Sequence, residues 1–235
     1  MAKKGGSSYM TTLEQGFGGI LLILYLVVLP FVAAPMFQGL ETLLGFQLTD
    51  HMESVIYYYA LFALTLAVFW NYIGRTTKLF LSSPLPALQT ALMGLVGFYG
   101  LNELSYRVLK LVTGGYANLN DMTISAQVND APRNTFLIIV LLAPFVEEVL
   151  FRGYVFGNIR NKSRTAAYII SCALFAALHV WQFAAVEQSI GNFLLMLQYF
   201  VPGIVFAWCY EQSGTLWTGI IAHAFVNALA MWSIT

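Results

Sequence analysis

The sequence predicts an all-α protein, a polytopic bundle of transmembrane helices. Of its 235 residues, 59% are hydrophobic and only 9% are charged, and the mean hydropathy is +0.72. Soluble domains carry about 25% charged residues, so this chain has too little charge to keep a globule of its size in solution. Apolar stretches recur along it, each able to cross about 30 Å of hydrocarbon as a helix rising about 1.5 Å per residue.

Seven apolar stretches are long enough to span a membrane, and an eighth crossing would still fit. The predicted spans cover residues 17–37, 55–73, 85–102, 135–157, 165–182, 192–210 and 215–233. The first could be taken for a signal peptide, but its apolar run of about twenty residues is longer than the usual core of one. We therefore predict a retained membrane anchor.

The spans fall into two groups. Residues 1–110 are predicted to form an N-terminal membrane region of about three spans. Residues 111–134 are the one long polar stretch and are predicted to be a connecting loop. Residues 135–235 are predicted to form a four-span core. The polar residues that lie inside spans crowd into this core, so it is where we expect the chemistry.

The distribution of Lys and Arg predicts an integral membrane protein whose N-terminus is cytoplasmic. In that orientation the inner side carries seven of these residues, namely Lys3, Lys4, Arg75, Lys78, Arg160, Lys162 and Arg164. The outer side carries three, Arg107, Lys110 and Arg133. Cytoplasmic loops are normally the richer in Lys and Arg.

Composition also excludes several classes of function. The formal net charge is zero, so there is no basic footprint for nucleic acid, and no Gly-rich phosphate loop indicates a nucleotide. Both cysteines, Cys172 and Cys209, fall inside spans and form no CxxC pair. Cys172 and His179 would share a helical face but lie about 10.5 Å apart along the axis, too far for a thiol dyad within one helix.

Three charged residues, Glu147, Glu148 and Arg152, lie within the fourth predicted span. One ionised group at bilayer depth costs roughly 2.5–3.5 kcal/mol on the mildest scale, so the cluster needs a compensating use. At about 100° per residue, Glu148 and Arg152 lie about 40° apart and one turn along the helix, so they can pair. Glu147 points about 100° away from Glu148. It is left as a free carboxylate, a candidate general base.

Two further pairs of residues, each with a histidine, lie on later spans at one-turn spacing. They are Phe175 with His179 and His223 with Asn227. Histidine is rare in a lipid span and generally faces the bundle interior or a cavity. Hydrolysis of a peptide bond needs an activated water and donors aimed at the oxyanion. Glu147 can take the proton of that water and His179 can orient it, while His223 and Asn227 can donate to the oxyanion.

Other classes of intramembrane protease leave signatures that this sequence lacks. It has no His-Glu-x-x-His for a zinc metalloprotease and no Gly-x-Gly-Asp for an aspartyl protease. A rhomboid-type motif has glycine two residues before its nucleophilic serine. In this chain the residue two before Ser213 of Ser213-Gly214 is Glu211. These three classes are therefore not expected.

The motifs Glu-Glu-x-x-x-Arg, Phe-x-x-x-His and His-x-x-x-Asn, in this order on apolar helices, resemble those of the CPBP family. This CAAX protease and bacteriocin-processing group, also called the ABI family, includes the CAAX prenyl endopeptidases. The stretch 200–203, Phe-Val-Pro-Gly, resembles a weaker third motif of the family.

The resemblance implies a glutamate-dependent intramembrane endopeptidase whose catalytic core is residues 135–235. Its catalytic residues would be Glu147 as base, His179 as its partner, and His223 and Asn227 as oxyanion donors. Glu148, Arg152 and Phe175 would support them. The resemblance also implies a conical cavity open toward the cytosolic side.

The partners expected are the lipid bilayer and a membrane-associated peptide or protein, with or without an attached lipid. The short chain resembles bacterial members, so we expect the bacterial cytoplasmic membrane. No cofactor is expected, although Glu147, His179 and His223 could supply a zinc site. Two alternatives to the glutamate-type protease therefore stay open. One is a metal-dependent membrane hydrolase, and the other is a non-catalytic membrane adaptor or bacteriocin-immunity protein.

Overall fold

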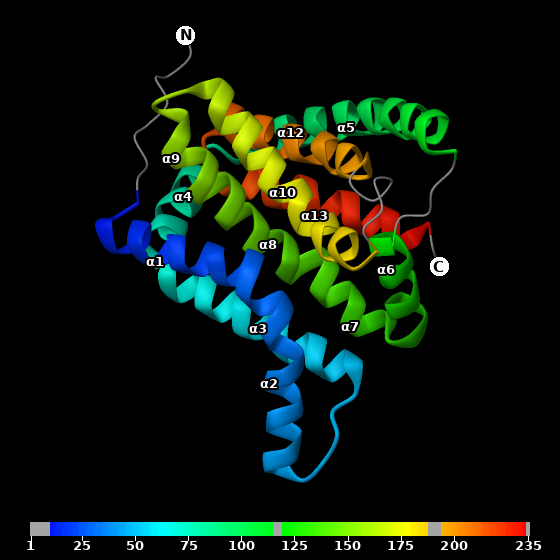
Figure 1. Cartoon of the computed structure of the whole chain (residues 1–235). Helices are drawn as coiled ribbons and strands as arrows, with labels where there is room; N and C mark the ends of the chain where they lie inside the picture. Colours follow the sequence, from blue (N-terminus) through cyan, green and yellow to red (C-terminus); the bar gives the residue numbers. More distant parts are fainter. Residues whose placement is uncertain (1–9, 115–118, 188–193, 234–235) are drawn as a thin grey trace.

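The computed structural model describes residues 10–114, 119–187 and 194–233 (Figure 1). Every regular element in these ranges is helical, which confirms the all-α prediction. The N-terminal half starts with one uninterrupted helix made of α1 (Thr12–Ile23), the π-helix η1 (Leu24–Val28) and α2 (Leu29–Leu44). It continues with α3 (Asp50–Val68), α4 (Trp70–Ser82) and α5 (Pro84–Thr113).

The C-terminal half is built around a second uninterrupted helix. Its segments are α7 (Pro132–Phe136), the π-helix η2 (Leu137–Leu142), α8 (Ala143–Glu147), the π-helix η3 (Glu148–Phe156) and α9 (Gly157–Arg160). Three further helices follow, α10 (Arg164–Glu187), α12 (Met196–Ser213) and α13 (Leu216–Trp232). The segments α7 to α9 are called the central helix below.

Five helices among the described residues are long and apolar enough to cross a membrane, so the chain is an integral membrane protein. They cover Thr12–Leu44, Asp50–Val68, Pro84–Val112, Pro132–Arg160 and Arg164–Trp181, and they correspond to the first five predicted spans. The last two predicted spans are occupied by α12 and α13, which are not among the five. Helix α13 is apolar but has only 17 residues.

The central helix is the buried one. Of the most apolar window of Pro132–Arg160, 72% is buried inside the protein, against 11–33% for the other four candidate spans. The remaining helices therefore surround the central helix and leave apolar faces outward, as a membrane protein in lipid requires. This arrangement puts the charged cluster of the sequence at the middle of the bundle.

The segment 111–134, predicted as a polar loop, is helical over most of the residues that the structure describes. Helix α5 continues to Thr113, and α6 (Leu119–Asp130) forms a further helix. The hydroxyl of Thr135 in α7 donates to the Gln127 carbonyl of α6 at 2.9 Å. His51 at the start of α3 also lies 3.6 Å from Asp130. The polar composition of the segment gave no sign of these contacts.

The helices run back and forth between two ends of the bundle. The first end holds the start of α1, helix α4, the α9–α10 junction and the α12–α13 junction (Figure 1). There Arg160 and Arg164 pair with Glu211 at 2.8 and 2.9 Å. Although partial burial alone would raise it, hydrogen bonds from Arg164 and Tyr168 hold the pKa of Glu211 below its ordinary value. The opposite end holds α6, the start of α7 and the end of α13.

Candidate active site

The charged cluster lies where α8 passes into the π-helix η3. Glu147 is the last residue of α8 and is 5% exposed. Glu148 is the first residue of η3, Arg152 lies four residues further along it, and both are fully buried. A π-helix holds an extra residue per turn and often marks a functional site. The two adjacent carboxylates at this junction lie in different surroundings, which are described in turn.

Glu148 lies in an ion-paired pocket. Its Oε1 is 3.0 Å from Nη1 of Arg152, an ion pair without the angles of a hydrogen bond, and 3.0 Å from Nδ1 of His223. The Arg152 guanidinium also donates through Nη2 to the Gly203 carbonyl at 3.2 Å and lies 4.3 Å from the centre of the Phe175 ring. The predicted Glu148–Arg152 pair is therefore present.

The second oxygen of Glu148 is accommodated by a glycine. A Cβ atom on Gly219 of α13 would lie 2.8 Å from Glu148 Oε2. Glu148 cannot easily retreat from such a methyl group, because Arg152 and His223 hold its other oxygen. The absence of a side chain at residue 219 is thus part of what shapes this pocket.

Replacing Gly219 with Ala should destabilise the protein by about 1–3 kcal/mol through overpacking, and should slow any reaction that needs His223. Thermal unfolding in detergent measures the first effect. Gly97→Ala on α5 is the matched control, since a Cβ there meets nothing within 4 Å. Alanine favours a helix over glycine, so Gly97→Ala should unfold at the same or a higher temperature. An equal loss in both variants would contradict the steric explanation.

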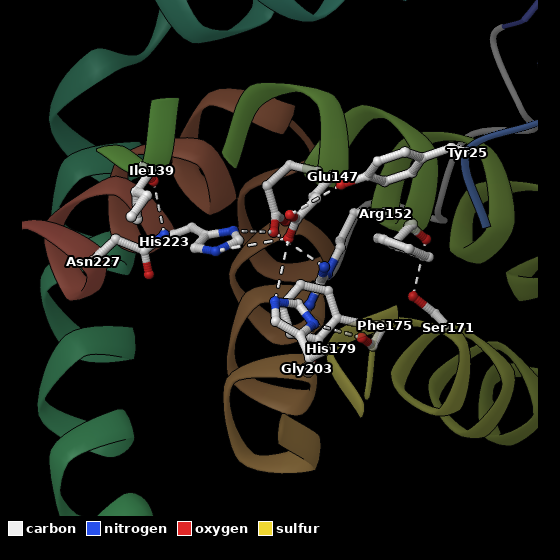
Figure 2. Close-up of polar contacts among 12 residues, drawn as sticks. Tyr25, Ile139, Glu147, Arg152, Ser171, Phe175, His179, Gly203, His223 and Asn227 are labelled. Carbon is white, nitrogen blue, oxygen red and sulfur yellow. Dashed lines mark hydrogen bonds and ion pairs between the residues drawn. The ribbon is translucent and has the colours of Figure 1, made fainter. Parts of the chain in front are cut away.

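Glu147 is arranged differently. Its Oε2 lies 3.9 Å from Nε2 of both His179 and His223, and is buried without a hydrogen-bond partner in the described structure. Its Oε1 accepts a hydrogen bond from the Tyr25 hydroxyl at 3.3 Å. Figure 2 shows the carboxylate between the two imidazoles and the tyrosine. A water molecule hydrogen-bonded to Oε2 would be within reach of both rings.

The two histidines present the same nitrogen to Glu147. Nδ1 of His179 is 2.8 Å from the Phe175 carbonyl, and Nδ1 of His223 is 3.0 Å from Glu148. A carbonyl or carboxylate oxygen only accepts, so each Nδ1 carries the proton and Nε2 faces Glu147. Aromatic neighbours fix the rings, with Tyr199 stacked on His179 and Phe206 on His223 at 4.5 Å each.

Asn227 lies one turn beyond His223. Its side-chain amide donates to the Ile139 carbonyl of η2 at 2.9 Å, and it lines the same cavity as Glu147 and the two histidines. An amide nitrogen has two N–H groups, so the bond to Ile139 fixes the side chain and leaves a second donor. The structure thus brings all four predicted catalytic side chains to one cavity.

That cavity has a volume of about 610 Å³. Its lining includes the buried Glu147 and His223 with His179, and also less buried, uncharged polar residues, namely Ser54, Thr123, Ser125, Gln127 and Ser233. These uncharged residues lie at the start of α3, in α6 and at the C-cap of α13. The cavity therefore extends toward the opposite end of the bundle, away from the start of α1.

The side chains of the site do not form a metal centre as they are placed. Within residues 10–114, 119–187 and 194–233, no three His, Cys, Asp or Glu side chains are grouped so that they could hold a metal ion. Glu147, His179 and His223 face one another, but the distances of 3.9 Å are wide for ligands of one zinc ion. As placed, these residues do not fit the zinc site considered from the sequence.

One site residue was missed by sequence reasoning. Tyr25 lies in the first helix, 122 positions from Glu147, and stands in an apolar run with no motif around it. A tyrosine in such a span resembles any interfacial or packing residue. Only the fold reveals its contact with the carboxylate.

Residues 131–229 match the family model "Type II CAAX prenyl endopeptidase Rce1-like". Over 90 residues the chain is 32% identical to UPF0177 protein YxdF of Lactococcus lactis, an alignment covering 38% of this chain and 44% of YxdF. Over 92 residues it is 28% identical to "Putative membrane peptidase YdiL" of Bacillus subtilis, covering 39% and 33%. The chain thus matches less than half the length of these curated relatives. No solved structure matches.

Proposed function

We propose that this chain is an intramembrane endopeptidase of the glutamate type. Its residues 131–229 match the Rce1-like family model, in agreement with the resemblance of the three sequence motifs. One observation carries the proposal: a buried carboxylate oxygen of Glu147, which has no hydrogen-bond partner among the described residues, lies 3.9 Å from Nε2 of both His179 and His223. Such an oxygen is positioned to take a proton from a water molecule in the cavity.

In the proposed reaction, Glu147 accepts a proton from water while the water oxygen bonds to the carbonyl carbon of the scissile peptide. The carbonyl π electrons move to oxygen, and Asn227 donates to that oxyanion. His223 can donate from Nε2 when its ring carries a second proton. The C–N bond then breaks, and the proton held by Glu147, relayed through His179, passes to the leaving amine. A carboxylic acid and an amine are released, and Glu147 is regenerated as a carboxylate.

The test is a comparison of membrane-associated peptides in cells that carry wild-type protein or Glu147→Ala. We expect one or more cleaved products to disappear with the variant and the uncut precursor to accumulate. Identical peptide profiles, with both proteins present at equal levels in the membrane, would contradict the proposal. A cellular phenotype that survives both Glu147→Gln and His223→Ala would favour the non-catalytic adaptor instead.

We propose further that the reaction needs no metal, which the spacing of Glu147, His179 and His223 supports. Cleavage by the purified protein should persist after chelation. Stoichiometric zinc in the purified protein, together with activity that chelation removes and zinc restores, would instead favour the metal-dependent hydrolase.

The same geometry bears on which side of the membrane substrates come from. Five Lys and Arg residues lie at the first end of the bundle, Arg75, Lys78, Arg160, Lys162 and Arg164, and three lie toward the opposite end, Arg107, Lys110 and Arg133. Lys3 and Lys4 lie outside the described residues. By the positive-inside rule the N-terminus is cytoplasmic, and the cavity then opens on the outer face. This proposal differs from the cytosolic opening that the family resemblance implies.

Cysteine labelling decides between the two orientations. In a background of Cys172→Ala and Cys209→Ala, a membrane-impermeant maleimide should label Gln127→Cys, at the cavity mouth, in intact cells. It should label Lys162→Cys, between α9 and α10, only after the membrane is permeabilised. The reverse pattern would mean that the cavity opens to the cytoplasm.

A further inference from the structure

The first helix enters the site through a break in its regular winding. Residues Leu24–Val28 form the π-helix η1 between α1 and α2. Tyr25 is the buried residue of this segment, with 3% of its surface exposed. Short π-helical segments within α-helices often occur at functional sites. Tyr25 is thus a buried polar group on a helix whose other residues are mostly exposed.

The hydroxyl of Tyr25 meets the carboxylate proposed as the base. It donates to Glu147 Oε1 at 3.3 Å, and Figure 2 shows it approaching the carboxylate from the side away from His223. This is longer than the usual 2.5–3.0 Å of an O–H···O bond. Catalytic hydrogen bonds are often long before substrate binds. Oε1 of Glu147 thus accepts a hydrogen bond from Tyr25, whereas Oε2 faces the two histidines.

We propose that Tyr25 is a positioning residue of the site, whose hydroxyl orients Glu147 so that Oε2 alone receives the proton of the water. This inference rests on the proposed function. A carboxylate on a side chain with three rotatable bonds would otherwise turn either oxygen toward the cavity. Tyr25 lies outside the matched region 131–229. The N-terminal helix therefore takes part in the chemistry of the C-terminal core.

The chain offers a matched control. Tyr57 lines the same cavity on α3, and no contact of its hydroxyl with Glu147 is present among the described interactions. Replacing Tyr57 with Phe removes the same atom from the same cavity without touching the carboxylate. A general loss of polarity in the cavity would affect both variants, whereas loss of positioning would affect only Tyr25→Phe.

The experiment is steady-state cleavage of a membrane peptide by purified full-length protein in detergent. The peptide is one identified by the comparison of wild type with Glu147→Ala. Tyr25→Phe should lower kcat roughly tenfold to 100-fold, the range expected for a hydrogen bond to a charged group, with KM unchanged. Tyr57→Phe should lower kcat far less than Tyr25→Phe, because its hydroxyl makes no described contact with Glu147. Equal kcat for Tyr25→Phe and wild type, or a change in KM alone, would overturn the proposal.

A double-mutant cycle separates this proposal from the proposed function. In a Glu147→Gln background, adding Tyr25→Phe should cause no further loss of residual activity, because the carboxylate that Tyr25 positions is gone. A further tenfold loss would show that Tyr25 acts independently of Glu147, and would overturn the positioning role alone. Full activity of Glu147→Gln itself would overturn both proposals. Thermal unfolding of each variant shows whether any loss reflects misfolding.

Discussion

Glu147→Gln should reduce the rate of peptide cleavage by roughly 10²–10⁴-fold, the usual contribution of a general base, while the protein stays folded. Glutamine has nearly the same shape as glutamate, and its amide oxygen can still accept from the Tyr25 hydroxyl. It cannot take a proton from water at neutral pH. We therefore expect Glu147→Gln to lower the cleavage rate strongly while changing the structure of the site very little.

The measurement is kcat/KM for a membrane peptide, with thermal unfolding of the same samples. Glu103→Gln is the control, since Glu103 pairs with Arg107 on the exposed surface of α5 and is not among the residues that line the cavity. It should behave like wild type in both assays. If Glu147→Gln cleaves peptide at the rate of wild type, Glu147 is not the base.

The sequence predicted best what depends on local helix geometry. Glu148 and Arg152 are four residues apart, and their pairing follows from helical winding alone. The meeting of Glu147 with His179 and His223 was predicted less directly. It rested on the rarity of such residues in apolar spans and on the resemblance of the motifs to those of a family. The structure brings these residues together, but their catalytic roles stay predictions.

Other features depend on contacts between distant segments and could not be read from the sequence. The three π-helices η1, η2 and η3 each supply a site contact, through Tyr25, the Ile139 carbonyl and Glu148. No residue pattern in those stretches distinguishes them from ordinary helix. The end of the bundle toward which the cavity extends depends on where α6 lies, and the sequence predicts a loop in place of α6.

Arg152 should be the residue on which folding depends most. It is fully buried, pairs with Glu148, donates to the Gly203 carbonyl and lies against Phe175. Arg152→Met keeps much of the volume but leaves the Glu148 carboxylate buried beside His223 alone. Removing one partner of a buried ion pair typically costs about 3–5 kcal/mol. We therefore expect a large fall in the unfolding temperature and little folded protein in the membrane.

The double variant Glu148→Gln with Arg152→Met distinguishes two explanations of that loss. If the cost comes from an unpaired buried charge, the double variant should recover much of the stability, because replacing both ions is often close to neutral. If it comes from lost packing against Phe175, recovery should be absent. Arg107→Met, in the exposed pair with Glu103, should leave the unfolding temperature nearly unchanged. Recovered stability without recovered cleavage would show that the Glu148–Arg152 pair also places His223, whose Nδ1 lies 3.0 Å from Glu148.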